Sequence, residues 1–186
     1  MRIVFAIVLS TMASATGLAQ TRYFTKSGKI TFYSRSPMEN IEAVNNKVVS
    51  IWDVNSGQIE FSVLMKGFEF EKALMQEHFN ENYVESDKYP KAIFKGIIES
   101  SNLLGLAVDR SAAVKVNGNL TMHGVTRPVT ATAVITVKNK LITAAASFSI
   151  VLADYKISIP SLVADKVNKK ITINVNIPDY QLVVKK

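Results

Sequence analysis

The 186-residue sequence contains no cysteine and only two histidines, His78 and His123. Without cysteine the chain has no disulfide, thiolate-bound zinc, iron–sulfur cluster, cysteine nucleophile or N-terminal cysteine for lipidation. Two histidines from distant segments make a poor transition-metal site. The simpler interpretation places His78 at a surface or hinge and has His123 bonding local backbone. The sequence therefore predicts no metal site and no cofactor.

Catalytic motifs are missing as well. The chain has no G-x-S-x-G elbow, no P-loop, no G-x-G-x-x-G and no H-E-x-x-H. Asp154 and Asp165 offer carboxylates that could pair with His123, but no nearby serine has the surroundings of a nucleophile. We therefore predict no catalytic residues, and a protein that is not an enzyme.

Acidic residues are the minority among the charged ones. The sequence has 22 Lys and Arg against 15 Asp and Glu, a formal net charge of +7. Such a charge favours anionic partners, namely phosphate head groups, an anionic membrane surface or nucleic acid. No strand shows the interleaved aromatic and basic residues of an RNA-binding surface, so we expect no nucleic-acid partner. The positive charge leaves two roles open: it could bring the protein to an anionic membrane, or it could only keep the protein soluble.

Long apolar runs are absent except at the start of the chain. Arg2 precedes an apolar stretch from Ile3 to about Ala15, and small residues lead to Ala19. These are the three regions of a secretory signal peptide. The alternative is an uncleaved anchor, but the stretch is shorter than the roughly 20 residues that a membrane span needs. The sequence predicts a signal peptide over residues 1–19, one domain over 20–186, and a periplasmic or secreted location.

The rest of the chain alternates apolar and polar residues, which is the pattern of β-strands with one buried face. The clearest segment is Ile171–Ile177, in which every second residue is Ile or Val and the others are Thr or Asn. Eight segments show the pattern: 30–35, 48–54, 58–66, 91–98, 114–122, 125–137, 143–152 and 171–177. A strand of thirteen residues spans roughly 40 Å, and long antiparallel strands favour a closed barrel because closure removes exposed edges. We predict an all-β fold, an extended antiparallel eight-stranded barrel.

Two segments break the alternation and predict helices. Residues 70–84 contain good helix formers, and Met75, Phe79 and Tyr83 form one apolar stripe. A shorter helix is predicted over 37–44, with Ser36 as its N-cap and Pro37 at its first position. His123-Gly124 separates two long strands and suits a tight hairpin.

The inward face mixes large and small residues, which leaves the nature of the interior open. Phe32, Phe61, Phe94 and Phe148 share this face with smaller residues such as Ala133. An eight-stranded barrel can be filled by side chains or hold one small ligand. A hollow apolar interior with a basic mouth would suit a lipid that carries a phosphate or similar head.

Several segments together resemble the YceI-like family, the polyisoprenoid-binding or lipid-binding YceI domain. The resemblance covers about residues 28–177. It is carried by Gly28–Phe32, Gly57–Phe61, Leu74-Met75, His78-Phe79, Tyr89–Gly96, Gly118–Thr126 and Asp154–Ile157. The family commonly has glycine after the aspartate-aromatic pair, where this chain has Lys156, so the resemblance does not extend to head-group specificity.

The resemblance implies a lipocalin-like barrel in the bacterial periplasm, which binds an isoprenoid or quinone-like lipid along its interior, with the polar head near the mouth. It also implies that the protein forms a homodimer, and it implies no reaction. Strand residues expected in the apolar cavity wall are Phe32, Phe61, Val63, Met65, Phe94, Leu120, Met122, Phe148 and Ile150. Met75, Phe79 and Tyr83 are expected to cover the cavity from the helix.

These observations support three functions to different degrees. The leading one is a periplasmic carrier of polyisoprenoid-type lipids. The alternative is an envelope stress or interaction protein whose barrel is solid and holds no ligand. An enzyme that acts on the bound lipid has the least support, because the sequence lacks catalytic motifs.

Overall fold

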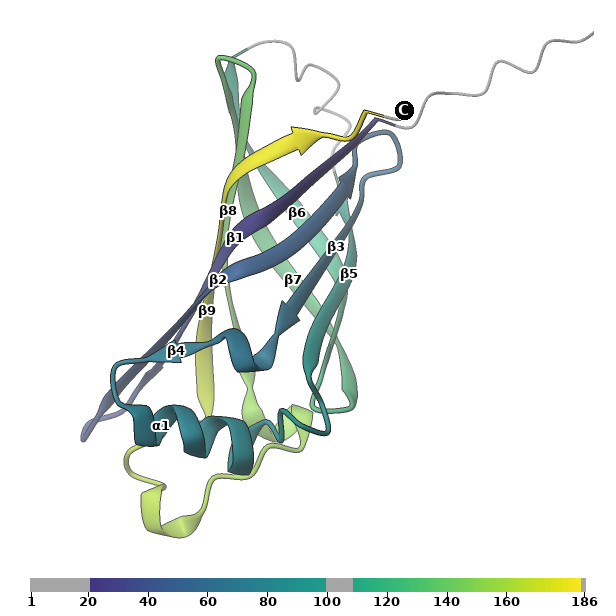
Figure 1. Ribbon diagram of the computed structural model, residues 1–186. Coiled ribbons are helices and arrows are strands. Elements are labelled where there is room, and N and C mark those ends of the chain that lie inside the picture. Colours follow the sequence, from purple (N-terminus) through teal and green to yellow (C-terminus); the bar gives the residue numbers. More distant parts are fainter. Residues whose placement is uncertain (1–20, 100–108, 185–186) are drawn as a thin grey trace, which may run out of the picture.

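The computed structural model describes residues 21–99 and 109–184, so the predicted signal peptide lies outside the described residues. Eight long strands form a closed antiparallel barrel (Figure 1). Around the barrel they follow the order β1-β9-β8-β7-β6-β5-β3-β2, and β1 pairs with β2 to close the ring. The strands are β1 (Arg22–Arg35), β2 (Asn40–Asp53), β3 (Gln58–Leu64), β5 (Lys91–Glu99), β6 (Arg110–Met122), β7 (Val125–Lys138), β8 (Leu141–Val151) and β9 (Lys170–Leu182). The predicted fold class is confirmed.

The two N-terminal strands are longer than the alternation predicted. Each has 14 residues, which corresponds to roughly 46 Å at the usual rise per residue. The register of β1 against β2 shifts on both sides of Gly28. Such a bulge shifts which residues of β1 face inward, so that the alternation before it is out of step with the alternation after it. This explains why the pattern in β1 was readable only from Ile30 onward. A Cβ atom added at Gly28 would lie 2.8 Å from the Cδ1 atom of Ile177, so β1 and β9 approach closely here.

The predicted helix over 37–44 is wrong. Residues from Asn40 onward belong to β2 and pair with β1, Ile41 opposite Ser34. Ser36 makes hydrogen bonds that resemble a cap, but they close a tight turn: its Oγ accepts from the Glu39 backbone N–H at 3.0 Å. Four residues suffice to reverse the chain, and the long ladder with β1 then fixes the residues after the turn as a strand.

The predicted helix over 70–84 is present in shorter form. Strand β4 (Glu69–Phe70) pairs with β2, so α1 (Ala73–His78) begins three residues later than predicted. A π-helical turn, η2 (Phe79–Tyr83), continues it. The remaining short elements are the 3-10 turns η1 (Met65–Gly67), η3 (Leu152–Tyr155) and η4 (Ser161–Val163).

The helix lies across one end of the barrel, and the loop that contains η4 extends beyond it (Figure 1). We call this the helix end.

The predicted hairpin at His123-Gly124 is present in the structure. Both residues have positive φ, 51° and 72°, as a tight turn between two strands requires. None of the helices in the described part of the chain is long and apolar enough to cross a membrane.

The buried residues form two clusters stacked along the barrel. One lies toward the helix end and includes Met65, Phe68 and Tyr155. The other lies toward the opposite end and includes Trp52, Ile142 and Tyr180. Phe61 and Phe94, which are only partly buried, pack against both clusters. The core is therefore divided rather than continuous.

Candidate functional site

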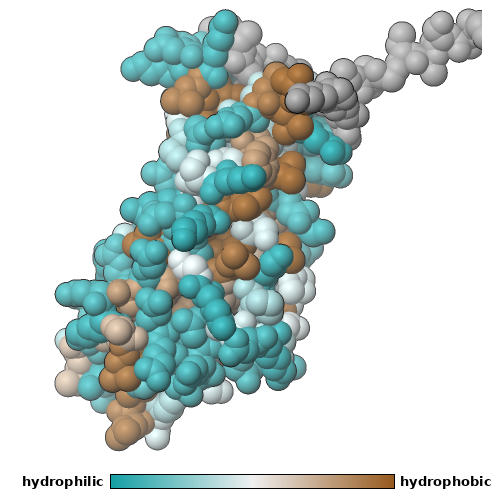
Figure 2. Space-filling model, in the orientation of Figure 1, coloured by the Kyte–Doolittle hydropathy of each residue, from teal (hydrophilic) through white to brown (hydrophobic). Residues whose placement is uncertain are grey.

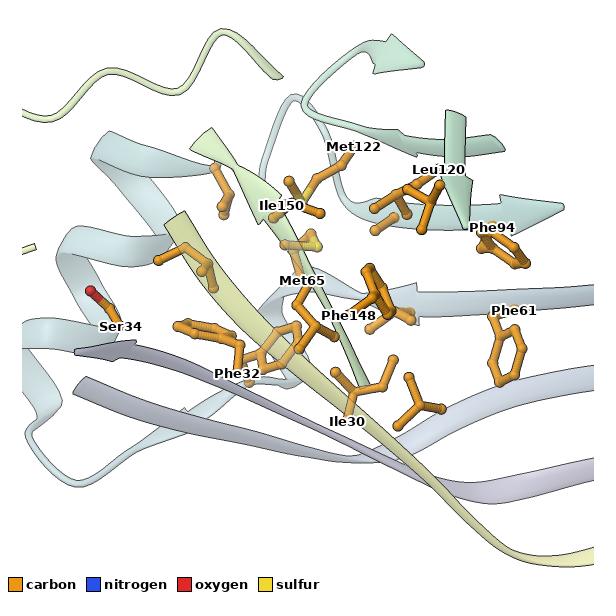
Figure 3. A pocket seen from close by; sticks show the side chains of 18 of the residues that line it. Ile30, Phe32, Ser34, Phe61, Met65, Phe94, Leu120, Met122, Phe148 and Ile150 are labelled. Carbon is orange, nitrogen blue, oxygen red and sulfur yellow. The ribbon is translucent and has the colours of Figure 1, made fainter. Parts of the chain in front are cut away.

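The interior of the barrel contains an apolar cavity of about 510 Å³. This volume lies within the range of about 300–1,000 Å³ that is usual for small-molecule sites. Residues from every barrel strand contribute to its wall, and Figure 3 shows side chains from opposite strands pointing into the same space, among them Ile30, Phe148 and Leu120. The barrel is therefore hollow, which the sequence had left open.

All twelve residues that the resemblance indicated lie in the wall of this cavity. They come from five strands, the η1 turn and the helical segment: Phe32, Phe61, Val63, Met65, Met75, Phe79, Tyr83, Phe94, Leu120, Met122, Phe148 and Ile150. Alternation places the strand members, because inward residues recur with a period of two. Contact of any of them with a ligand stays a prediction.

Two glycines shape the middle of the cavity. Gly96 and Gly118 lie opposite each other on β5 and β6. A Cβ atom would lie 2.7 Å from the Phe94 ring if added at Gly96, and 2.6 Å if added at Gly118. The ring of Phe94 therefore rests on bare backbone, which keeps it close to the wall. Its centroid lies 6.3 Å from that of Phe61, and the two rings lie where the two core clusters meet.

The end away from the helix is closed by buried aromatic residues. Trp52 is 1% exposed and its ring centroid lies 5.9 Å from that of Tyr180. The hydroxyl groups of Tyr180 and Ser50 share a hydrogen bond of 2.8 Å. Burial raises the pKa of Tyr180 to about 12, and the hydrogen bond with Ser50 opposes this rise. This end is a tightly packed floor.

Four phenylalanines attach the helical segment to the barrel. The ring of Phe79 lies against those of Phe32, Phe68 and Phe70, at centroid distances of 5.5, 5.7 and 5.1 Å. Tilted aromatic pairs at this range stabilise beyond the area that they bury. The cluster holds the helical segment over the cavity as its cover.

The charged residues of the cavity wall all lie at the helix end. They are Glu39, Lys72 and Lys166, and His78 lies with them. The Lys72 ammonium donates to a Glu39 carboxylate oxygen at 3.0 Å, which ties α1 to the turn between β1 and β2. Lys72, His78 and Lys166 are exposed, so the cavity opens here. We call this opening the mouth.

A second junction joins the cover to the barrel at His123. Its Nδ1 lies 2.9 Å from the carbonyl oxygen of Tyr155, and its Nε2 lies 2.8 Å from a carboxylate oxygen of Glu85. Both oxygens accept hydrogen bonds, so both contacts are satisfied together when each ring nitrogen carries a proton. The Tyr89 ring packs against the imidazole at a centroid distance of 4.8 Å. The expected bond to local backbone is wrong, because Tyr155 and Glu85 are both remote in sequence.

Lys156 comes directly after η3 with φ of 58°, in the left-handed region. This is the position at which the family commonly has glycine, and glycine adopts that conformation without strain. The departure from the family pattern thus leaves the backbone turn intact.

Sequence reasoning missed several wall residues. Ile30 and Trp52 lie on strand faces that alternation does identify, so the pattern contained them. Phe68 lies between η1 and β4, and Phe70 lies in the two-residue strand β4, which is too short to show a period. Glu39 and Lys166 are distant in sequence and meet at the mouth only in the folded barrel.

A family model for the YceI-like domain matches residues 12–178, which is most of the chain. The chain belongs to the YceI-like domain family. The family is one of binding proteins rather than enzymes. An apolar cavity inside a closed barrel suits the binding of an apolar molecule. No curated protein matches the chain.

Solved structures of other proteins share the fold. A polyisoprenoid-binding domain from Saccharophagus degradans, implicated in plant cell wall breakdown, is 14% identical with a TM-score of 0.77, over 88% of this chain and 99% of that one. BcnA from Burkholderia cenocepacia is 14% identical with a TM-score of 0.68, over 84% and 96%. A YceI protein from Campylobacter jejuni is 15% identical with a TM-score of 0.52, over 100% and 94%. At these identities the comparisons support the fold alone.

Proposed function

We propose that this protein is a carrier of a polyisoprenoid or quinone-like lipid, which lies in the barrel with its polar head at the mouth. The apolar cavity carries the proposal. Each CH₂ group taken out of water contributes about 0.8 kcal/mol, so a few isoprene units are enough for tight binding. Membership of the YceI-like family and the likeness to a polyisoprenoid-binding domain support the same ligand class.

The location proposed is the periplasm or the outside of the cell. It rests on the N-terminal sequence pattern, which predicts cleavage after Ala19. Lys72 and Lys166 would face the head of the lipid, and their charge favours a head that is anionic or rich in hydrogen-bond acceptors. The proposal is one of binding and transfer, and it assigns no reaction to these residues.

The hollow interior argues against an interaction protein with a solid barrel. That alternative predicted no cavity, whereas the described strands enclose one. A protein partner on the outer surface would not account for an apolar interior of this size.

The first test is native mass spectrometry of the protein purified from its own host without detergent. We expect a lipid adduct in one-to-one ratio that is lost on denaturation. We also expect the polypeptide mass to equal that of a chain that starts at Gln20. The spectrum also reports oligomeric state, for which the resemblance predicts a homodimer. An apo protein that also refuses added solanesol, a polyprenol, would overturn the carrier function.

A pair of neighbouring substitutions on β8 locates the binding site. Phe148→Asp places a charge in the cavity and should abolish solanesol binding, because an ionised carboxylate is strongly disfavoured next to an apolar chain. Ser149→Asp adds the same charge one residue later on the exposed face, and binding should be unchanged. Binding is measured by displacement of a fluorescent fatty-acid probe, with circular dichroism to verify folding. Undiminished binding by folded Phe148→Asp would exclude this cavity as the site.

A further inference from the structure

The helix end carries apolar side chains that the fold leaves uncovered. Leu162, Met38 and Leu74 are 92%, 68% and 61% exposed, and they are three of the four most exposed large apolar residues in the described part of the chain. They come from three separate elements, η4, the β1–β2 turn and α1. Figure 2 shows brown reaching the lowest tip of the molecule, where Figure 1 places the η4 loop.

Hydrogen bonds and one ion pair hold these three elements around the mouth. The Glu39–Lys72 pair joins the turn that contains Met38 to the start of α1. The Asn168 side chain donates to the Arg35 carbonyl at 2.7 Å, and its backbone N–H donates to the Ser34 hydroxyl at 2.8 Å. These bonds join the η4 loop to the end of β1. The exposed apolar residues therefore form one rim, defined as Met38, Leu74 and Leu162.

The rim is continuous with the cavity. Leu74 is exposed on the outside and also lines the cavity, and Val163, next to Leu162, lines it as well. An apolar path thus runs from the outer tip of the molecule to the cavity wall. The charged residues of this opening, Glu39, Lys72 and Lys166, stand beside the path.

We propose that the rim inserts into the surface of a lipid bilayer, so that a lipid passes between membrane and cavity without crossing water. This inference rests on the proposed carrier function. Three side chains on separate projecting elements offer far less than the roughly 800 Å² per partner of a typical protein interface, whereas single apolar residues suit insertion among acyl chains.

Insertion is driven by the apolar residues rather than by net charge. Among the charges next to the rim, Lys72 is paired with Glu39 and Lys166 follows Asp165 in the sequence, while Arg35, Lys169 and Lys170 add positive charge at the same end. Attachment should therefore occur on neutral vesicles and should persist at about 1 M salt, where the Debye length is about 3 Å. An electrostatic attachment by the overall basic charge predicts the opposite on both points.

The test compares two double variants on vesicles of phosphatidylcholine, with and without phosphatidylglycerol. Met38→Ser/Leu162→Ser removes the rim side chains that do not line the cavity. Leu141→Ser/Leu182→Ser removes two apolar residues away from the helix end, which are 48% and 54% exposed. In vesicle flotation the rim variant should bind about tenfold more weakly or worse, and the control variant should match the wild type.

Three results would overturn the inference: equal binding by the rim variant and the wild type, equal loss in both variants, or wild-type binding that requires phosphatidylglycerol and disappears in salt. A rim variant that converts a dimer to a monomer without changing flotation would assign the rim to a second copy of the chain instead.

Uptake of solanesol separates this inference from the carrier function. The rim variant should take up solanesol from dilute ethanol as the wild type does, but should extract it more slowly from vesicles. If the wild type takes up none by either route, the carrier function fails, while flotation still decides whether the rim binds bilayers.

Discussion

Two requirements place most single residues in this barrel: inward side chains are apolar, and buried polar groups have hydrogen-bond partners, with Trp52 Nε1 and Asn80 Oδ1 as exceptions in the described part of the chain. Ser50 and Tyr180 show the second requirement most clearly. Both are buried, on β2 and β9, and each hydroxyl has the other as its hydrogen-bond partner. Alternation predicts that Ser50 faces inward, but it does not predict which hydroxyl it meets.

The raised pKa of Tyr180 makes stability depend on pH in the alkaline range. The pKa rises from 10.0 to about 12 on burial. Below pH 10 the phenol is neutral in both states. Between pH 10 and about 12 the unfolded chain ionises while the folded one does not, so the free energy of unfolding falls by about 3 kcal/mol across this interval.

Urea unfolding at a series of alkaline pH values measures this fall. In Ser50→Ala/Tyr180→Phe the buried pair is replaced by apolar groups, and the contribution should vanish. Tyr33→Phe, a change in a side chain that is only partly buried, should retain it. The same pH dependence in all three proteins would contradict the assignment to Tyr180.

Among the elements, the helical cover is the one whose position depends most on contacts remote in sequence. The apolar stripe of Met75, Phe79 and Tyr83 was readable from the sequence, and these residues do face the cavity. The start of α1 was not readable from the sequence, because Phe70 pairs with Ala43 of β2 and so belongs to a strand. The false helix at 37–44 has the same cause, since strand pairing outweighs local capping signals.

The junction at His123 should hold the end of this cover in place. His123→Ala removes contacts to Tyr155 and Glu85, and should lower the free energy of unfolding by about 1–3 kcal/mol. Hydrogen exchange should accelerate over 79–89 and 152–157, with the β6–β7 ladder unchanged. His78→Ala is the matched control, because His78 is exposed and should leave both measurements as they are. Unaltered exchange in His123→Ala would show that the phenylalanine cluster alone holds the cover.

At the scale of the whole molecule, a hollow core ties stability to ligand binding. The cavity of about 510 Å³ forgoes packing contacts that a solid barrel would make. A ligand that binds only the folded state adds about 2.7 kcal/mol when its free concentration is 100 times the Kd. Solanesol should therefore raise the melting temperature of the wild type in a concentration-dependent way, and should leave that of Phe148→Asp unchanged. A melting temperature that does not respond to solanesol would count against occupancy of the cavity.

The sequence by itself determined the strands, the closed antiparallel barrel and the apolar inner face, because side-chain alternation is a local property of an extended backbone. That is why the eight strand residues among those that the resemblance indicated, Phe148 and Phe61 included, face one space. Only the tertiary structure decided that the space is hollow, since this depends on how side chains from opposite walls meet across the barrel. It also decided where the mouth lies, because Glu39, Lys72 and Lys166 are separated in the chain and come together only when β1, α1 and the η4 loop reach the same end.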